Sequence, residues 1–258
     1  MRDTDLQRVR ALPLFSGVSS DVFRRLTGGA FLQRFPAGTT LLLEGDRVDF
    51  LYVLLDGTVE LQGAWKDRET TLAVLRPVST FILAAVVLDA DGLMSARTLQ
   101  RSEIFMLSGE VIRRTMKEDS DFAFAVSQEL AGCYRGLVRS IKSQKLRTGV
   151  ERLANYLITQ RIRQGAEDKI TLQYEKRVLA ALLGMTPENL SRAFASLASH
   201  GVTVRGPTVT FSRLEALERL ARPSPLIDNH MPPQNRITSK GESERWASEV
   251  ARAVGYAH

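Results

Sequence analysis

The sequence predicts an α+β protein with an N-terminal β jelly roll, one long helix and a C-terminal winged helix-turn-helix. Three observations lead to this prediction. Short β-rich runs fill residues 31–107, an uninterrupted helical pattern covers residues 119–146, and two short helical patterns meet at a glycine within residues 176–197. With 258 residues, 44% of them hydrophobic, the chain is long enough to form two separate cores.

Residues 1–118 are predicted to form the jelly roll with a small helical lead-in at residues 11–15 and 21–26. The runs rich in strand-forming residues are separated by turn signals at intervals of roughly 8 to 15 residues, as in a sandwich or jelly roll. Asp56-Gly57 is a dipeptide typical of a hairpin, so we expect the strands on either side of it to pair. The predicted strands include residues 40–43, 50–55, 58–61 and 71–75.

Residues 119–147 are predicted to form a dimerisation helix. Its apolar or small positions step by four, three, four and four, which produces one narrow stripe near the spacing of a coiled-coil seam. Because polar residues surround this stripe, we expect two copies of the chain to pack along it; a helix that lies on its own sandwich is the alternative. The stripe consists of Val126, Leu130, Cys133, Leu137 and Ile141.

Residues 148–222 are predicted to form the winged helix-turn-helix. The segment 148–151 has the Thr-x-x-Glu pattern of a capping box, which places the start of a new helix directly after Arg147. Further along, residues 176–183 form a short apolar-faced helix, and Gly184 supplies the tight break that such a motif needs.

The second helix of this module has the chemistry of a helix that reads DNA. Thr186 can cap it, and Pro187 fits its first position, where a missing N–H costs nothing. Glu188, Ser191 and Arg192 then share the face that enters the major groove. Glutamate can accept a hydrogen bond from cytosine, and arginine can donate two to guanine. The alternative is an ordinary surface helix with an ion pair between Glu188 and Arg192.

A wing is predicted to follow this helix. Residues 202–211 alternate like two strands around a tight turn, and Arg205 at the tip is placed for a phosphate contact; an arginine that is only solvated in the turn is the alternative. The net charge of +6 and the pI near 9.7 favour anionic partners, of which double-stranded DNA is one and an acidic membrane surface another. The predicted DNA contacts are Thr186, Pro187, Glu188, Asn189, Ser191, Arg192 and Arg205.

Composition narrows the other possibilities. One cysteine, Cys133, excludes an intramolecular disulfide and a cysteine-ligated metal cluster. Apolar runs stay short of the roughly 20 residues of a membrane span, and the N-terminus does not resemble a signal peptide, so we expect a cytoplasmic protein with no membrane partner. Without a phosphate-cradling loop, a metal-ligand cluster or a histidine near a nucleophile, we expect no catalytic residues and no enzyme activity.

The combined pattern resembles the CRP/FNR family of bacterial transcription regulators over roughly residues 10–222. In the jelly roll, the resemblance lies in Gly38-x-x-Leu41-x-x-x-Gly45-Asp46 and in the run Tyr52-Val53-Leu54-Leu55-Asp56-Gly57-Thr58-Val59. The resemblance implies a cyclic-nucleotide-binding-like jelly roll, a homodimer, and RNA polymerase as a partner. A regulatory or scaffold module whose winged domain binds protein instead of DNA is an alternative.

The recognition helix resembles the FNR branch of that family. Glu188-x-x-Ser191-Arg192 is similar to the FNR-type triplet, which implies half-sites resembling TTGAT arranged as an inverted repeat. The residue before the glutamate is Pro187, whereas the cyclic-AMP branch usually has arginine there.

The ligand motifs of the family do not match. Cyclic-nucleotide binders of this fold resemble one another in a Gly-Glu pair for the ribose and an Arg-Ser pair for the phosphate. Here leucine and alanine occupy the ribose positions, and Gly92 and Leu93 fall at the phosphate positions, so a phosphate would be buried unpaired. Leu137 and Val138 stand where that branch has a Thr-Ser pair. We expect no control by cyclic AMP; Arg97 as a substitute phosphate ligand is the alternative.

No cofactor is predicted, and the effector is left open. An iron–sulfur cluster needs four thiolates, and this chain has one cysteine. A haem sensor needs an axial histidine or cysteine in the sensory half, and the three histidines, His200, His230 and His258, all lie outside that half. Cys133 is either a thiol switch or a small buried hydrophobe. The apolar sandwich lining, either a filled core or a cavity, comprises Phe81, Ile82, Leu83, Val86, Val87, Leu88 and Met94. The candidate effector pocket comprises Phe81, Leu83, Val86, Met94, Arg97, Leu137 and Val138.

Residues 223–258 are predicted to be a Pro-rich linker and tail that can be disordered. Trp246, Val250 and Val254, at four-residue steps, predict one short helix near the end of the chain.

Overall fold

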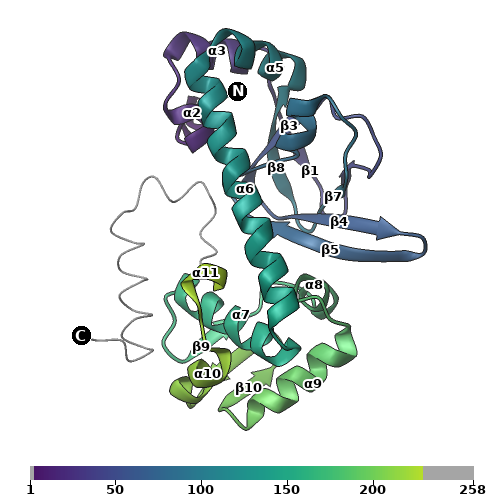
Figure 1. The fold of residues 1–258 in the computed structure, drawn as a ribbon, viewed down its shortest axis with the longest axis vertical. Helices are drawn as coiled ribbons and strands as arrows, with labels where there is room; N and C mark the ends of the chain where they lie inside the picture. The colour runs from purple at the N-terminus through teal and green to yellow at the C-terminus, as the bar shows by residue number, and fades with distance from the viewer. Residues whose placement is uncertain (1–2, 229–258) are drawn as a thin grey trace. The chain divides into compact units, whose positions relative to one another are not determined.

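The computed structural model describes residues 3–228 (Figure 1). The described residues divide into two compact units, the first ending at Tyr134 and the second beginning at Arg135. None of the described helices is both long enough and apolar enough to span a bilayer. Trp246, Val250 and Val254, for which a helix was predicted, lie outside the described residues.

Three helices precede the sheets of the first unit: α1 (Asp3–Arg10), α2 (Pro13–Ser16) and α3 (Ser20–Thr27). The predicted helical lead-in is therefore confirmed. One sheet has the order β1-β8-β3-β6, formed by Phe31–Phe35, Ser102–Ser108, Phe50–Asp56 and Ser79–Phe81. The other has the order β2-β7-β4-β5, formed by Thr40–Leu42, Ser95–Thr98, Val59–Trp65 and Arg68–Leu75.

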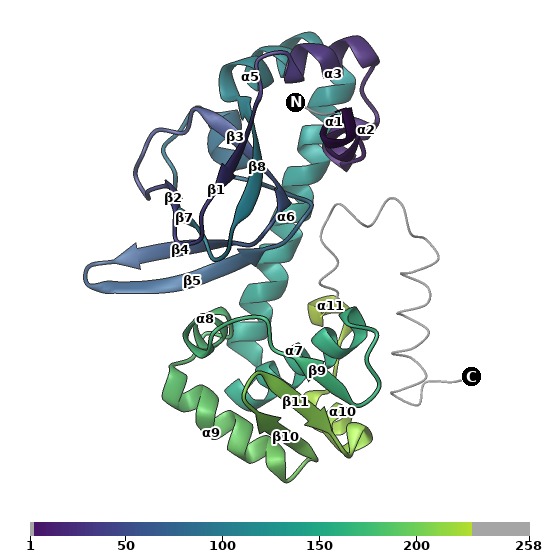
Figure 2. The same cartoon turned by 180° about the vertical axis from the view of Figure 1, so that it is seen from behind.

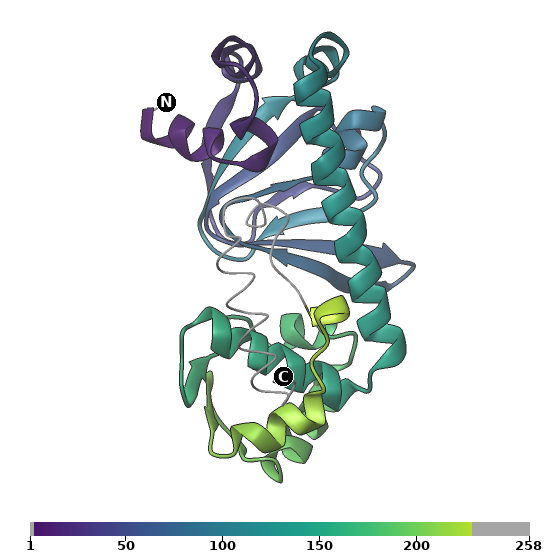
Figure 3. The same cartoon turned by 60° about the vertical axis from the view of Figure 1, so that its left-hand side comes forward.

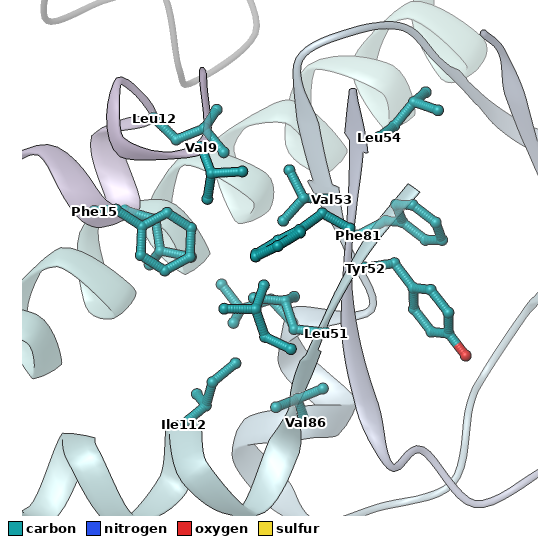
Figure 4. Packing of buried hydrophobic residues seen from close by; sticks show 14 of the residues in the cluster. Val9, Leu12, Phe15, Leu51, Tyr52, Val53, Leu54, Phe81, Val86 and Ile112 are labelled. Carbon is teal, nitrogen blue, oxygen red and sulfur yellow. The ribbon is translucent and has the colours of Figure 1, made fainter. Parts of the chain in front are cut away.

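Strand β3 is buried on both faces, which explains its uninterrupted apolar sequence (Figure 4). Leu51 lies on the side that faces Phe15 and Ile112, whereas Tyr52 lies on the opposite side. The Tyr52 ring stacks on Phe81 with 5.1 Å between ring centroids. One continuous core therefore packs on both faces of β3, against the β2-β7-β4-β5 sheet on one side and against helices of the same unit on the other.

The prediction that the strands around Asp56-Gly57 pair is wrong. β3 belongs to one sheet and β4 to the other, so this turn carries the chain between sheets. Gly57 has φ of +97°, and a Cβ there would lie 2.6 Å from the carbonyl oxygen of Arg101. The position requires glycine because of this close approach, and not because of a hairpin. The hairpin of this region joins β4 and β5 instead, where Trp65 pairs with Arg68.

The stretch from Phe81 to Leu88 is not a continuous lining of the sandwich. β6 ends at Phe81, and helix α4 (Leu83–Leu88) begins two residues later. Helical spacing turns Leu83 and Val86 into the core but leaves Leu88 75% exposed. Leu88 as a lining residue was therefore wrong.

Two further helices follow β8, namely α5 (Gly109–Glu118) and α6 (Ser120–Leu146), and α6 is continuous over its 27 residues (Figure 3). Thr148 and Glu151 then form the predicted capping box at the start of α7 (Gly149–Arg163). The Thr148 amide donates to the Glu151 carboxylate over 2.7 Å, and the Glu151 amide donates to the Thr148 hydroxyl oxygen over 3.3 Å. This reciprocal bonding satisfies two amides that the helix itself cannot pair.

The rest of the second unit contains the predicted helix-turn-helix and wing (Figure 2). A three-stranded sheet of order β10-β11-β9 forms the wing, and its hairpin pairs Val202 with Phe211 and Arg205 with Thr208. Strand β9 was not predicted. The elements after α7 are β9 (Lys169–Thr171), α8 (Lys176–Leu182), α9 (Pro187–Ala198), β10 (Val202–Arg205), β11 (Thr208–Phe211), α10 (Leu214–Ala221) and α11 (Pro225–Asp228).

Candidate nucleic-acid interface

The turn between α8 and α9 is tight and depends on glycine. Gly184 has φ of +63°, a left-handed conformation that other residues adopt only with strain. The Gly184 amide donates to Ala181 over 2.8 Å, and the Met185 amide donates to Ala180 over 2.9 Å. Leu179 and Leu190, on the two helices, are buried in one core. The turn and this core together determine the angle at which α9 leaves α8.

Helix α9 begins where the sequence predicted. The Thr186 side chain accepts a hydrogen bond from the Asn189 amide over 3.3 Å, and Pro187 occupies the first turn. The pKa of Glu188 is lowered by hydrogen bonds from its own backbone amide and from the Thr186 hydroxyl, with Arg192 and Lys176 contributing positive charge. Glu188 therefore remains a carboxylate at neutral pH, which can only accept hydrogen bonds.

The exposed face of α9 presents a donor beside acceptors. Glu188, Asn189 and Arg192 are exposed, and Ser191 is partly exposed. Within residues 3–228, Arg192 forms no ion pair with Glu188; its guanidinium donates to the Asn189 side-chain oxygen over 3.4 Å. The Ser191 hydroxyl donates to the Pro187 carbonyl over 2.7 Å. The carboxylate of Glu188 and the guanidinium of Arg192 are thus both available to a ligand.

The wing places Arg205 at an exposed end of β10. Gly206, with φ of +58°, and Pro207 form the turn beyond it. The Leu172 amide donates to the Pro207 carbonyl over 2.7 Å, and strand β11 of the hairpin pairs with β9 on the side away from β10. Arg205 is therefore carried by a braced hairpin and not by a free loop.

Lys176 is a further candidate contact that was not among the residues predicted from the sequence. Lys176 and Arg177 are exposed in the first turn of α8. Lys176 lies close enough to Glu188 to lower its pKa, so it shares the surface on which α9 begins. The sequence signal for this contact was the pair of consecutive cations, Lys176 and Arg177, at the start of the first helix of the motif, because lysine and arginine side chains commonly contact DNA phosphates.

The predicted dimerisation stripe is divided in the structure. Val126 is fully buried in the core of the first unit, and Leu130 packs partly buried against that core. Val126 is therefore not available to a second copy, and its assignment to the seam was wrong: the start of α6 covers its own sandwich. By contrast, Leu137 is 63% exposed and Ile141 is 56% exposed.

Leu137, Val138 and Ile141 form an exposed apolar face, called here the α6 face. Their spacing of one, three and four residues places them on one side of the helix. Val138 is 38% exposed, less than its two neighbours. Solvent contact of three branched apolar side chains in one stripe is typical of a surface that a partner covers.

The position of Cys133 does not favour thiol chemistry. The single cysteine lies at the surface of the chain, but nearby protein atoms desolvate its sulfur. Desolvation and the Glu129 carboxylate raise the pKa of Cys133 to about 11. The thiolate, which is the reactive form, is therefore scarce at neutral pH.

We expect iodoacetamide to alkylate Cys133 slowly at pH 7.5, roughly a hundredfold or more below a free thiol with the usual pKa of about 8.5. The rate should rise about tenfold per pH unit up to pH 10, because the thiolate fraction does so below a pKa of about 11. Mass spectrometry of the intact chain from pH 7 to pH 10 measures this. A rate that levels off near pH 8.5 would contradict it.

The candidate effector residues of the first unit are mostly part of its packed core. Phe81, Leu83 and Val86 are buried members of the core, and Met94 packs partly buried against it. Val86 lies on the side of β3 that faces Ile112, whereas Phe81 stacks on Tyr52 (Figure 4). These residues are therefore distributed through the core and do not all share one surface.

Arg97 lies on the side of β7 that faces away from the core. Its neighbours Ala96 and Thr98 are fully buried, so strand alternation directs Arg97 to the opposite face of β7, where Glu60, itself only 1% exposed, lies opposite it in the strand register. The Arg97 side chain is exposed and donates to the Gly38 carbonyl over 3.2 Å. Leu137 and Val138, the remaining candidates for the pocket, belong to the second unit.

Two family models match this chain: a cyclic nucleotide-binding domain over residues 32–119 and a Crp-like helix-turn-helix domain over residues 151–220. The chain is similar to the CRP-like cAMP-activated global transcriptional regulator of Mycobacterium tuberculosis, with 24% identity over 81% of this chain and 96% of the relative. It is also similar to the cyclic AMP receptor protein of Thermus thermophilus, with 25% identity over 83% of this chain and 98% of the relative.

Solved structures share the fold. A putative transcriptional regulator of the CRP/FNR family from Eubacterium rectale has a TM-score of 0.69 at 16% identity, covering 83% of this chain and all of that chain. FixK2 from Bradyrhizobium japonicum has a TM-score of 0.64 at 18% identity, covering 76% of this chain and 98% of that chain. With the two domain models in this order and the capped recognition helix between α8 and the wing, this chain belongs to the CRP/FNR family of DNA-binding transcription regulators.

Proposed function

We propose that this regulator binds an inverted-repeat, FNR-like DNA site as a homodimer and that cyclic AMP does not control it in the usual way. The observation that supports base reading most directly is the exposed face at the start of α9, where a carboxylate and a guanidinium stand one helical turn apart. We propose RNA polymerase as the protein partner of this regulator.

Each half-site is read by Glu188 and Arg192. Glu188 accepts a hydrogen bond from the amino group of cytosine, and Arg192 donates to O6 and N7 of guanine. These two contacts fit the G·C pair of a half-site resembling TTGAT. Lys176 and Arg205 contact phosphates on either side, which positions α9 without reading sequence.

Dimerisation is supported by the α6 face. An inverted repeat presents two half-sites related by a two-fold axis, and a two-fold dimer matches that symmetry. A second copy of this chain that packs against Leu137 and Ile141 would cover their exposed side chains. The dimer seam proposed here thus excludes Val126 and uses only the later part of the helix.

Leu137→Glu is expected to weaken dimerisation a hundredfold or more. The two introduced carboxylates would face each other across the seam, and an uncompensated buried charge costs about 3 to 5 kcal/mol. Sedimentation velocity from 0.1 to 50 micromolar measures the dissociation constant. Leu88→Glu is the matched control, because Leu88 is exposed on α4. A Leu137→Glu variant as dimeric as the parent would contradict the seam.

Independence from cyclic AMP is supported by the connection between α4 and β7. Residues 89–94 contain two carboxylates, Asp89 and Asp91, and no cation. Wherever in this connection the family's Arg-Ser pair is aligned, no arginine or lysine is therefore present to hold a phosphate. Arg113 and Arg47 are drawn to Asp89, at 3.1 and 3.8 Å. The two guanidiniums beside this connection therefore already pair with a carboxylate of the chain, and Asp91 adds a second carboxylate nearby.

A second candidate function is a regulator that responds to a cyclic nucleotide through Arg97. Two relatives named for cyclic AMP, and the matching nucleotide-binding domain model, favour it. The orientation of Arg97 away from the core disfavours it. Titration with cyclic AMP while DNA binding is monitored separates the two functions.

A further inference from the structure

A buried ion pair joins the end of the described chain to the junction between α6 and α7. Arg147 lies between Leu146, the last residue of α6, and the cap of α7. Its guanidinium forms a two-pronged contact with the Asp228 carboxylate, in which Nη2 and Oδ2 are 2.6 Å apart. The two side chains are only 8% and 5% exposed. Such a pair, with both charges removed from water, differs in kind from the surface ion pairs of this protein.

The turn that carries Asp228 is built to present this carboxylate. The Ser224 amide donates to Asp228 Oδ2 over 2.6 Å, and the Asp228 amide donates back to the Ser224 carbonyl over 2.7 Å. Arg147 also donates to the Arg222 carbonyl over 3.4 Å. We call residues 222–228 the C-terminal clasp; it begins after the end of the matched helix-turn-helix domain at residue 220. Figures 1 and 2 both show its helix α11 beside α7.

Arg152 extends this contact to the turn of the helix-turn-helix. Its Nη1 donates to the Arg147 carbonyl over 2.6 Å, and its Nε donates to the Leu183 carbonyl over 2.7 Å. Its Nη2 reaches the Gly184 carbonyl at 3.3 Å. Partial burial lowers the pKa of Arg152, but arginine remains a cation at neutral pH. One guanidinium thus links the junction to the residues that precede α9.

A continuous series of hydrogen bonds therefore runs from Asp228 through Arg147 and Arg152 to Gly184. The base-reading side chains of α9 take no part in it. Loss of Asp228 would leave the Arg147 cation buried without its partner, and the junction would have to rearrange to hydrate it. Such a rearrangement changes where α9 is held and leaves unchanged what α9 recognises.

We propose that the C-terminal clasp is a positioning element that sets which half-site spacing this regulator accepts. In a two-fold dimer, the angle at each junction determines the distance between the two recognition helices, and one base pair along DNA is only about 3.4 Å. The clasp holds that angle through Arg147. This role rests on the proposed dimer and its inverted-repeat site.

The test compares Asp228→Ala with the parent in the full chain, on two series of DNA. One series varies the spacer of an inverted repeat by one and two base pairs; the other keeps the best spacer and changes single half-site bases. For Asp228→Ala we expect the preference for the best spacer to fall at least fivefold and the base preference to stay within twofold of the parent. Glu215→Ala is the matched control, since it breaks the exposed Glu215–Arg219 pair on the neighbouring α10, with side chains 89% and 74% exposed.

A second variant separates positioning from stability. Asp228→Ala combined with Arg147→Met removes the unpaired charge, so its melting temperature should recover towards the parent, while the spacer preference should remain relaxed. Recovery of both overturns the positioning role. An unchanged spacer preference in Asp228→Ala, or an equal loss at all spacers and bases, overturns it as well. If the parent protein bound all spacers and an isolated half-site with equal affinity, both the proposed dimer site and the role of the clasp would be wrong. If the parent preferred one spacer but Asp228→Ala did so equally, only the role of the clasp would be wrong.

Discussion

Arg192→Ala is expected to weaken DNA binding by about 1 to 3 kcal/mol in each half-site and to relax the preference at one base pair. Arg192 is exposed, and among the described residues its guanidinium donates a hydrogen bond only to the Asn189 side-chain oxygen. Its removal therefore leaves the fold of α9 intact and deletes a pair of hydrogen bonds to guanine. Fluorescence anisotropy with an inverted repeat and its single-base variants measures both effects.

Arg205→Ala is the control for this measurement. Because Arg205 is expected to meet a phosphate, its loss should weaken all sequences alike and reduce the slope of log K against log salt by about 1. If the relative affinities for the base variants were the same in Arg192→Ala as in the parent, Arg192 would not be a base-reading residue.

Cyclic AMP and cyclic GMP are expected not to bind this protein at low micromolar concentration. A buried phosphate that lacks its cationic partner costs about 3 to 5 kcal/mol, which weakens affinity a hundredfold or more. The α4–β7 connection contains Asp89 and Asp91 where a cation would be needed. Isothermal titration calorimetry with each nucleotide, up to millimolar concentration, tests this expectation.

A titration with low micromolar affinity and a matching gain in DNA affinity would refute this second prediction. The variant Arg97→Ala would then show whether Arg97 or another group binds the phosphate of the nucleotide. If it abolished that binding, Arg97 would be the phosphate ligand in spite of its outward orientation. If it had no effect, the nucleotide would be held by groups outside the site that the family uses.

The parts of the fold that the sequence predicted depend on short-range signals. The capping box of Thr148 and Glu151, the break at Gly184 and the cap at Thr186 all involve residues within a few positions of each other. Their geometry depends on local hydrogen bonds and backbone freedom, which neighbouring residue types reveal directly. The start of the recognition helix could therefore be predicted to the residue.

The errors arose where distant segments decide the outcome. The turn at Asp56-Gly57 has the chemistry of a hairpin, but the approach of Arg101 determines which strands pair. Val126 matched the dimer stripe in spacing, whereas the sandwich of its own chain buries it. Asp228 follows prolines that predicted a linker, and its partner Arg147 is 81 residues away. Single-sequence spacing contains no information on these contacts.

The hydroxyl of Ser191 gives its hydrogen to the carbonyl of Pro187, so only its lone pairs face outward. Ser191 can then take a hydrogen bond from the amino group of adenine or cytosine, but it has none to give to the keto oxygen of guanine or thymine. In the proposed complex, Ser191 and Glu188 would both accept hydrogen bonds from base amino groups, whereas Arg192 would donate to O6 and N7 of guanine. If α9 reads bases as proposed, its exposed and partly exposed polar side chains divide into acceptors at Glu188 and Ser191 and a donor at Arg192, and the half-site must offer amino groups to the first two and a guanine edge to the third.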